Sequence, residues 1–245
     1  MTAGTAVTPD RIMKMRGIVY GVGVGPGDPE QMTLAACRLI RENDIIAIPG
    51  TDPQQSAAYR IAVQAVPELA EKTLVMIDMP MVRSREEIEN AHRSGADAIA
   101  AYLDRGKNVV YLTLGDPSFY CSFSYLQSIL EEQGYSVCLV SGIPSFCAAA
   151  AKLDLPLALG EEPVHIIPAS GKMFDRTAGG MDLPGTVIFM KTARHMREVK
   201  AFLEKSGREA YAVENCGMEN EHVYRRAEDI PDTAGYFTLV VTKEK

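Results

Sequence analysis

The hydrophobic and polar positions of the chain form short apolar runs separated by amphipathic segments over the first 150 residues. Continuous apolar and β-branched runs are typical of strands buried on both faces. Segments between them carry apolar residues at helical spacing. Strands that alternate with helices predict a mostly parallel α/β domain. The predicted strands are 17–24, 44–48, 73–77, 109–114 and 137–140, and the predicted helices are 32–40, 52–72, 86–104, 119–132 and 145–151.

From about residue 157 this rhythm changes, because several predicted strands follow one another with only one clear helix, at 193–205. This pattern predicts a second α/β domain that contains antiparallel strands. We therefore divide the chain into a loose leader (1–16), an N-terminal α/β domain with a mostly parallel sheet (17–141) and a C-terminal α/β domain with a mixed sheet (142–245). The strands predicted for the second domain are 164–168, 186–190, 210–214, 222–226 and 236–242.

A glycine turn follows the most apolar strand of the first domain. The strand stops at Gly115, and Asp116 and Pro117 are typical of a helix N-cap and first helical position. Residues 21–29 repeat this arrangement, with Asp28 before Pro29. Since ligands of open α/β sheets bind outside the carboxyl ends of the strands, we expect a ligand site at these turns.

The glycine run at 21–27 does not match the known phosphate-binding patterns. In a dinucleotide fingerprint, Pro26 or Asp28 would occupy the position of the third glycine, and no Gly-Lys-Ser/Thr follows. Two interpretations remain open. The run is either a tight turn without a ligand, or a stretch of bare backbone that a large flat ligand approaches closely.

Composition narrows the class of protein. The chain has 245 residues, is 47% hydrophobic and carries a formal net charge of −7, which argues against a nucleic-acid partner. Its five cysteines form no CxxC pair and the four histidines show no ligand spacing, so we expect reduced thiols, a cytoplasmic location and no metal site. No apolar run reaches the ~18 residues of a membrane span, and the leader lacks a signal-peptide core.

Five motifs in order resemble those of the tetrapyrrole methylases, which use S-adenosylmethionine. The resemblance spans about residues 17–242. Within the family it is strongest to the precorrin-2 C-20 methyltransferases of cobalamin synthesis. Leu114 stands where uroporphyrinogen methylases carry a glycine, and Thr113-Leu114 stands where C-11 methylases carry His-Thr. The motifs are Gly21-Val-Gly-Val-Gly-Pro-Gly-Asp-Pro, Leu114-Gly-Asp-Pro-Ser-Phe-Tyr, Gly142-Ile-Pro-Ser-Phe, the strand ending at Met190, and Val213-Glu-Asn.

The resemblance implies two α/β domains of the tetrapyrrole methylase type, with S-adenosylmethionine in the trough between them. It implies no catalytic side chain, because positioning of the reactants dominates methyl transfer. Relatives are homodimers, and the alanine-rich segment 147–151 suits a buried role in a two-fold dimer. The residues that the resemblance places at the cofactor are Pro26, Leu114, Gly115, Asp116, Phe119, Pro144, Ser145, Met190 and Cys216.

The implied substrate is a polycarboxylate, so an acidic protein needs local cations to bind it. Cationic residues in predicted loops are the candidates, together with Gly25 in the first glycine loop. They are Arg83, Arg85, Lys172, Arg176 and Lys191. The sequence leaves open whether the tetrapyrrole carries cobalt. Alternatives are a methylase acting at another ring carbon (C-11 or uroporphyrinogen III), a non-catalytic tetrapyrrole carrier, and an NAD(P)-dependent oxidoreductase.

Overall fold

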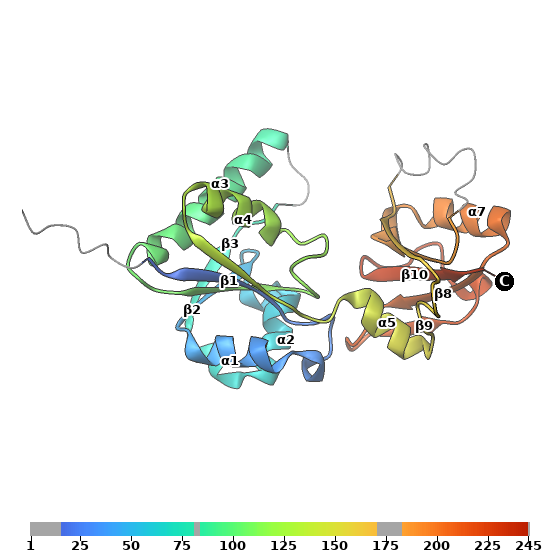
Figure 1. The fold of residues 1–245 in the computed structure, drawn as a ribbon, viewed down its shortest axis with the longest axis horizontal. Helices are drawn as coiled ribbons and strands as arrows, with labels where there is room; N and C mark the ends of the chain where they lie inside the picture. The colour runs from blue at the N-terminus through green and yellow to red at the C-terminus, as the bar shows by residue number, and fades with distance from the viewer. Residues whose placement is uncertain (1–15, 81–83, 171–182, 245) are drawn as a thin grey trace, which may run out of the picture.

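The computed structural model describes residues 16–80, 84–170 and 183–244. Its first half contains a five-stranded sheet in the order β3-β2-β4-β1-β5 (Figure 1). All four neighbouring pairs in this sheet are parallel. The prediction of a parallel α/β half is therefore confirmed. Its strands are β1 (Ile18–Gly23), β2 (Ile45–Pro49), β3 (Thr73–Ile77), β4 (Val109–Thr113) and β5 (Ser136–Val140).

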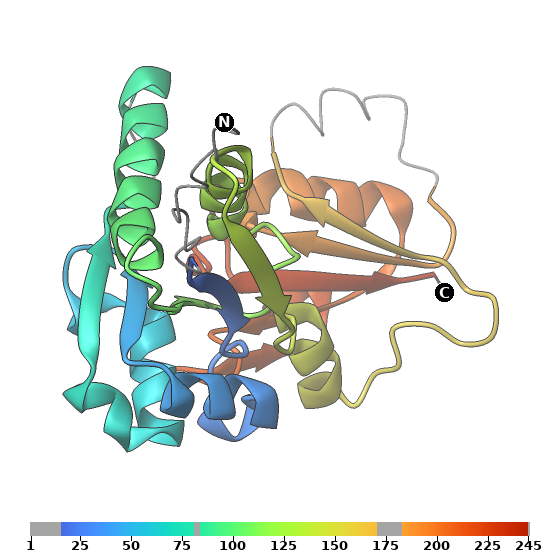
Figure 2. The ribbon, with the colours of Figure 1, turned by 60° about the vertical axis from the view of Figure 1, so that its left-hand side comes forward.

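Helices cover both faces of this sheet (Figures 1 and 2). Helices α1 (Leu34–Glu42) and α2 (Ala57–Ala65) pack on one face, and α3 (Arg85–Leu103) and α4 (Phe123–Glu132) on the other. Alternate residues of the central strand β4 are buried on opposite faces of the sheet. Leu112 packs in the core on the α1 and α2 side, and Tyr111 in the core on the α3 and α4 side. This double burial explains why the strand is apolar throughout. Short 3₁₀ turns lie at Pro29–Gln31, Pro53–Gln55 and Pro67–Glu71.

The second half contains a mixed sheet in the order β6-β7-β10-β8-β9. Strands β6 and β7 are parallel, and the other neighbours are antiparallel. Helices α5 (Ser145–Leu153) and α7 (Met196–Ser206) pack on opposite faces of this sheet. The predicted mixed sheet is confirmed. Its strands are β6 (Val164–Pro168), β7 (Thr186–Met190), β8 (Glu209–Glu214), β9 (His222–Tyr224) and β10 (Thr238–Lys243), with 3₁₀ turns at Thr192–Arg194 and Ala227–Asp229.

The alanine-rich helix α5 packs inside its own chain. Ala148 and Ala149 are buried against Val213 of β8 and Val241 of β10. The burial expected of these alanines is thus satisfied without a second subunit, so the homodimer stays a prediction. The connection between the two halves is residues 141–144, which link β5 to α5. Among the described residues, no helix has the length and apolar character needed to cross a membrane.

Four local predictions were wrong. The predicted helix 52–72 is instead a 3₁₀ turn (Pro53–Gln55), helix α2 (Ala57–Ala65) and a second 3₁₀ turn (Pro67–Glu71). The helix after Gly115 begins at Phe123 rather than Pro117, and a turn-rich loop fills the interval. The helix after Asp28 begins at Leu34, where the Thr33 hydroxyl accepts from the N–H of Ala36 at 3.2 Å. Arg85 is the first residue of α3, not a loop residue.

Candidate functional site

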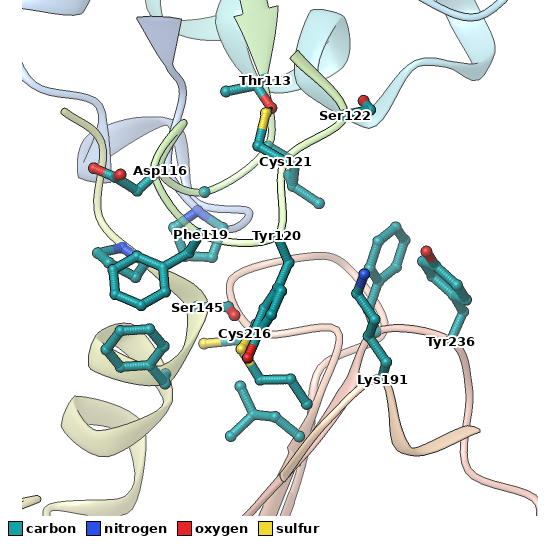
Figure 3. Close-up of a pocket in the computed structure, with 18 of the residues that line it drawn as sticks. Thr113, Asp116, Phe119, Tyr120, Cys121, Ser122, Ser145, Lys191, Cys216 and Tyr236 are labelled. Atoms are coloured by element: carbon teal, nitrogen blue, oxygen red, sulfur yellow. Dashed lines mark hydrogen bonds between the residues drawn. The ribbon is translucent and has the colours of Figure 1, made fainter. Parts of the chain in front are cut away.

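A cavity of about 270 Å³ lies where the carboxyl end of β4 meets the second sheet (Figure 3). Both halves of the chain contribute to its wall. All nine residues that the sequence placed at a cofactor line this cavity, and so does Lys191. The nine are Pro26, Leu114, Gly115, Asp116, Phe119, Pro144, Ser145, Met190 and Cys216. Their convergence is a property of the fold; that they bind a cofactor remains a prediction.

Sequence reasoning missed about half of the wall. Strand β10 pairs antiparallel with β7, so the start of β10 lies beside the end of β7 at Met190. An antiparallel pairing of these two apolar runs was the signal that could have revealed this part of the wall. The missed residues are Pro49, Thr113, Tyr120, Cys121, Ser122, Phe146, Tyr236, Phe237, Thr238 and Leu239.

The glycine loops close on one another through bare backbone. Gly25 and Gly115 form a bridge in which the Gly115 N–H donates to the Gly25 carbonyl at 2.8 Å and the Gly25 N–H donates back at 3.2 Å. A Cβ on Gly23 or Gly142 would lie 2.5 or 2.1 Å from the Gly115 carbonyl oxygen. These glycines therefore serve loop packing. Gly25, expected at the substrate, is buried in this contact and does not line the cavity.

Gly115 differs from its glycine neighbours. Its φ is +72°, which L side chains rarely adopt. A Cβ added there would find only the Ile143 carbonyl oxygen, at 4.0 Å. Since Gly115 also lines the cavity, the space over its backbone is open to a ligand. This open approach is found at Gly115. In the run at 21–27, an added Cβ would lie 2.3–3.1 Å from another protein atom at every glycine, so the glycines of that run are required for packing.

The buried carboxylate of Asp116 joins two loops. One oxygen accepts from the N–H of Gly142 at 2.9 Å, and the other accepts from the N–H of Ser118 at 2.8 Å and from its hydroxyl. Figure 3 shows the carboxylate directed away from the middle of the cavity. These hydrogen bonds fix the main chain around Asp116. The carboxylate oxygens of Asp116 are already used as acceptors within the protein.

The Val213-Glu-Asn motif supports the opposite wall. The Glu214 carboxylate accepts from the N–H of Gly235 at 2.7 Å and from the Tyr224 hydroxyl at 3.1 Å. Asn215 adopts φ +52°, and its amide donates to the Asn220 carbonyl at 3.1 Å. These bonds fix the two loops that bring Cys216 and Tyr236 to the cavity.

Among the described residues, the cavity wall contains few charges and no thiol with a lowered pKa. Burial raises the pKa of the Cys216 thiol to about 11, and burial also raises the pKa of Cys121. Both thiols are therefore protonated at neutral pH, in the form that is weakly nucleophilic. Lys191 lies with its ammonium nitrogen 5.2 Å from the centre of the Tyr120 ring, a cation–π geometry. No group of three His, Cys, Asp or Glu side chains in the described ranges is arranged to hold a metal.

The remaining substrate predictions have different outcomes. Arg85 is highly exposed and pairs with Glu89 one helical turn away at 2.8 Å. Arg83, Lys172 and Arg176 lie outside the described residues. Lys191 is the predicted cation that the structure places on the cavity wall.

A cavity between two α/β halves, bounded by a glycine turn, is typical of α/β proteins with a small-molecule site. The family model of the Tetrapyrrole (Corrin/Porphyrin) Methylases matches residues 18–230. The chain belongs to this family.

Similar proteins carry related names. A probable cobalt-precorrin-2 C(20)-methyltransferase of Methanocaldococcus jannaschii is 32% identical over 84% of this chain and 85% of its own length. A precorrin-2 C(20)-methyltransferase of Sinorhizobium sp. is 31% identical over 92% of this chain and 94% of its own. The chain spans about half (46%) of the length of the cobalamin biosynthesis protein CobIJ of Mycobacterium bovis, at 30% identity over 94% of this chain.

The fold is shared with solved structures. A uroporphyrin-III C-methyltransferase from Thermus thermophilus, solved in complex with S-adenosylhomocysteine, matches with a TM-score of 0.66. The match covers 93% of this chain and 98% of that one at 21% sequence identity, which supports the likeness of fold.

Proposed function

We propose that this protein is an S-adenosylmethionine-dependent methyltransferase that methylates C-20 of precorrin-2 or cobalt-precorrin-2 in cobalamin biosynthesis. The observation that carries the proposal is the open backbone of Gly115 on the wall of the cavity between the two sheets. Family membership and the names of the two relatives with near-full-length matches support the reaction type and the ring position.

The residues of the cavity fit the cofactor. Leu114, Gly115 and Asp116 line the wall, and the open space over Gly115 lets a ligand approach the main chain there, while Phe119 and Met190 supply apolar surface. Bound S-adenosylmethionine would supply a methyl group that its sulfonium already activates. The contribution of the chain is then to hold the reactants in line, which is worth about 7–11 kcal/mol. General-base catalysis contributes typically 10²–10⁴-fold, or about 3–5 kcal/mol. A wall with protonated thiols and no acid–base pair suits this division of work.

The metal content of the substrate stays open within the proposal. The relative named for the cobalt complex and the relative named for the metal-free compound are 32% and 31% identical to this chain. Identity this close gives no ground for preferring either substrate. We therefore propose that precorrin-2 and cobalt-precorrin-2 be tested side by side. We also propose that the enzyme is a two-fold symmetric dimer in the cytoplasm.

The test is turnover of purified protein with S-adenosylmethionine that carries a labelled methyl group. We expect the tetrapyrrole product to gain one labelled methyl group by mass spectrometry, and NMR to place it at C-20. A methyl group at another ring carbon would refute the ring position but keep the family reaction. Cofactor binding without turnover of either substrate would favour a carrier. A thermal shift with NAD(P)H and none with S-adenosylhomocysteine would overturn the cofactor.

A further inference from the structure

A second cavity, of about 350 Å³, adjoins the first. Phe237 lines both. Two loops that contact each other contribute to both cavities. Pro26 and Cys216 line the first cavity, and the residues that follow them, Gly27 and Gly217, line the second. A Cβ on Gly27 would lie 2.3 Å from the Cys216 carbonyl oxygen, so these loops meet backbone to backbone. This loop contact and Phe237 therefore lie at the boundary of the two cavities.

Arg60 of α2 lines the second cavity and is exposed. Its guanidinium forms no ion pair or hydrogen bond with the rest of the described chain. The nearby α1 arginines differ, since Arg38 pairs with Glu42 at 2.7 Å and Arg41 with Glu68 at 3.9 Å. Arg60 is therefore an exposed arginine beside a cavity, and its planar guanidinium is of the kind that binds a carboxylate with two hydrogen bonds.

The size of the first cavity favours a substrate that extends beyond it. Sites for drug-sized ligands have volumes of about 300–1,000 Å³. At about 270 Å³, the first cavity is small for a cofactor and a tetrapyrrole together. The second cavity shares Phe237 with the first and offers adjacent space.

We propose that the second cavity is a subsite for a carboxylate side chain of the tetrapyrrole, an acetate or propionate, and that Arg60 binds this group. The inference rests on the proposed function for the identity of the substrate. A guanidinium matches a carboxylate with two parallel hydrogen bonds. The Gln64 amide lines the same cavity and donates one of its two N–H groups to the Arg60 carbonyl at 2.7 Å.

Glu219 allows a second test, because its charge is opposite to that of Arg60. Its carboxylate lines the same cavity and is the acidic group there. It forms no ion pair with Arg60 within 4.0 Å in the described structure. A substrate carboxylate that enters this cavity is attracted by one residue and repelled by the other. Neutralising each residue should therefore change the substrate affinity in opposite directions.

The experiment compares Arg60→Gln, Arg60→Lys and Glu219→Gln with Arg93→Gln as the matched control. Arg93 is an exposed arginine on α3, on the other face of the sheet. We expect Arg60→Gln to raise the KM for the tetrapyrrole about three- to fivefold at low salt, in keeping with a solvent-accessible ion pair. The increase should shrink at high salt. Arg60→Lys should raise KM less, Glu219→Gln should lower it, and Arg93→Gln should leave it unchanged.

A second set of readouts separates this subsite from a structural effect and from the reaction itself. The turnover number and the S-adenosylhomocysteine affinity should be unchanged in Arg60→Gln. Absorbance titration with precorrin-2 measures substrate binding even if the wild type shows no turnover. If the wild type binds precorrin-2 without turnover and Arg60→Gln is the arginine variant that binds it more weakly, the subsite is supported although the proposed reaction is refuted. Equal affinity of the wild type and Arg60→Gln in this titration overturns the subsite, as does an equal loss in Arg93→Gln.

Discussion

Replacement of Gly115 tests the placement of the cofactor most directly. Its φ of +72° is unfavourable for any L residue, but an added Cβ would lie 4.0 Å from the nearest non-neighbouring atom of the described residues. Gly115→Ala therefore strains the backbone and adds a methyl group to the cavity without a clash with these residues, and Gly115→Val fills more of the same space. Gly207 provides the control, because its φ is +64° and an added Cβ there meets nothing within 4 Å. It follows α7 and does not line the cavity.

The two alanine variants should lose similar stability. A left-handed conformation costs an L residue about 1–2 kcal/mol. For a protein of this size, each kcal/mol lowers Tm by about 2–4 °C, so both variants should melt about 2–8 °C below the wild type. S-adenosylhomocysteine at one hundred times its Kd stabilises the folded state by about 2.7 kcal/mol. That is a rise in Tm of about 5–11 °C for a protein that binds it.

The assay is thermal unfolding with and without S-adenosylhomocysteine. We expect the wild type and Gly207→Ala to show the full rise in Tm, Gly115→Ala to show a reduced one, and Gly115→Val to show none. A strained backbone alone would affect the Gly115 and Gly207 alanine variants equally. If Gly115→Val keeps the rise seen in the wild type, the cofactor does not approach this turn and the reasoning about the cavity is refuted.

Four further predictions concern the loops, the charges, pH and assembly. Asp116→Ala should lower the free energy of unfolding by about 1.5–3 kcal/mol, because the Gly142 N–H loses a charged acceptor; urea titration measures this. Lys191→Gln should raise the tetrapyrrole KM and leave S-adenosylmethionine affinity nearly unchanged, and an unaltered KM at low and high salt would contradict its role. Burial raises the pKa of the Cys216 thiol from 9.0 to about 11. Between pH 9 and about 11, the thiol therefore stays protonated in the folded state but loses its proton in the unfolded chain. Stability should fall as pH rises from about 9 to about 11, and part of this fall should be absent in Cys216→Ala. Light scattering at micromolar concentration should give a dimer mass, whereas a monomer mass would disprove the two-fold assembly.

Strand positions were well predicted because they depend on local pattern. The predicted strands 73–77, 164–168 and 186–190 match β3, β6 and β7, and the others differ from the observed strands by a few residues at their ends. A run of apolar, β-branched residues is suited to a strand covered on both faces wherever it lies in the sheet. The motifs of the family resemblance were also informative, since the nine residues they indicated line one cavity.

Helix starts were predicted less well because capping residues have other possible partners. Asp116 has the side chain and the following proline of an N-cap, yet its carboxylate accepts from Gly142, 26 residues away. The segment before Phe123 therefore forms a loop that lines the cavity instead of the first turn of α4. Local sequence cannot distinguish these uses, since both satisfy the same carboxylate oxygens.

The residue pattern was enough to predict the two α/β halves, the parallel and mixed sheets and the glycine turns, and the motifs were enough to predict the family. Which side chains line the same cavity became clear only in the folded chain. Residues 236–239 reach the cavity because β10 pairs with β7, and Arg60 lines the neighbouring cavity because α2 lies beside the 215–220 loop. Hydrophobic periodicity is a local property that can be recognised within a few residues. A cavity depends on contacts between loops far apart in the sequence, which form only when both sheets are in place.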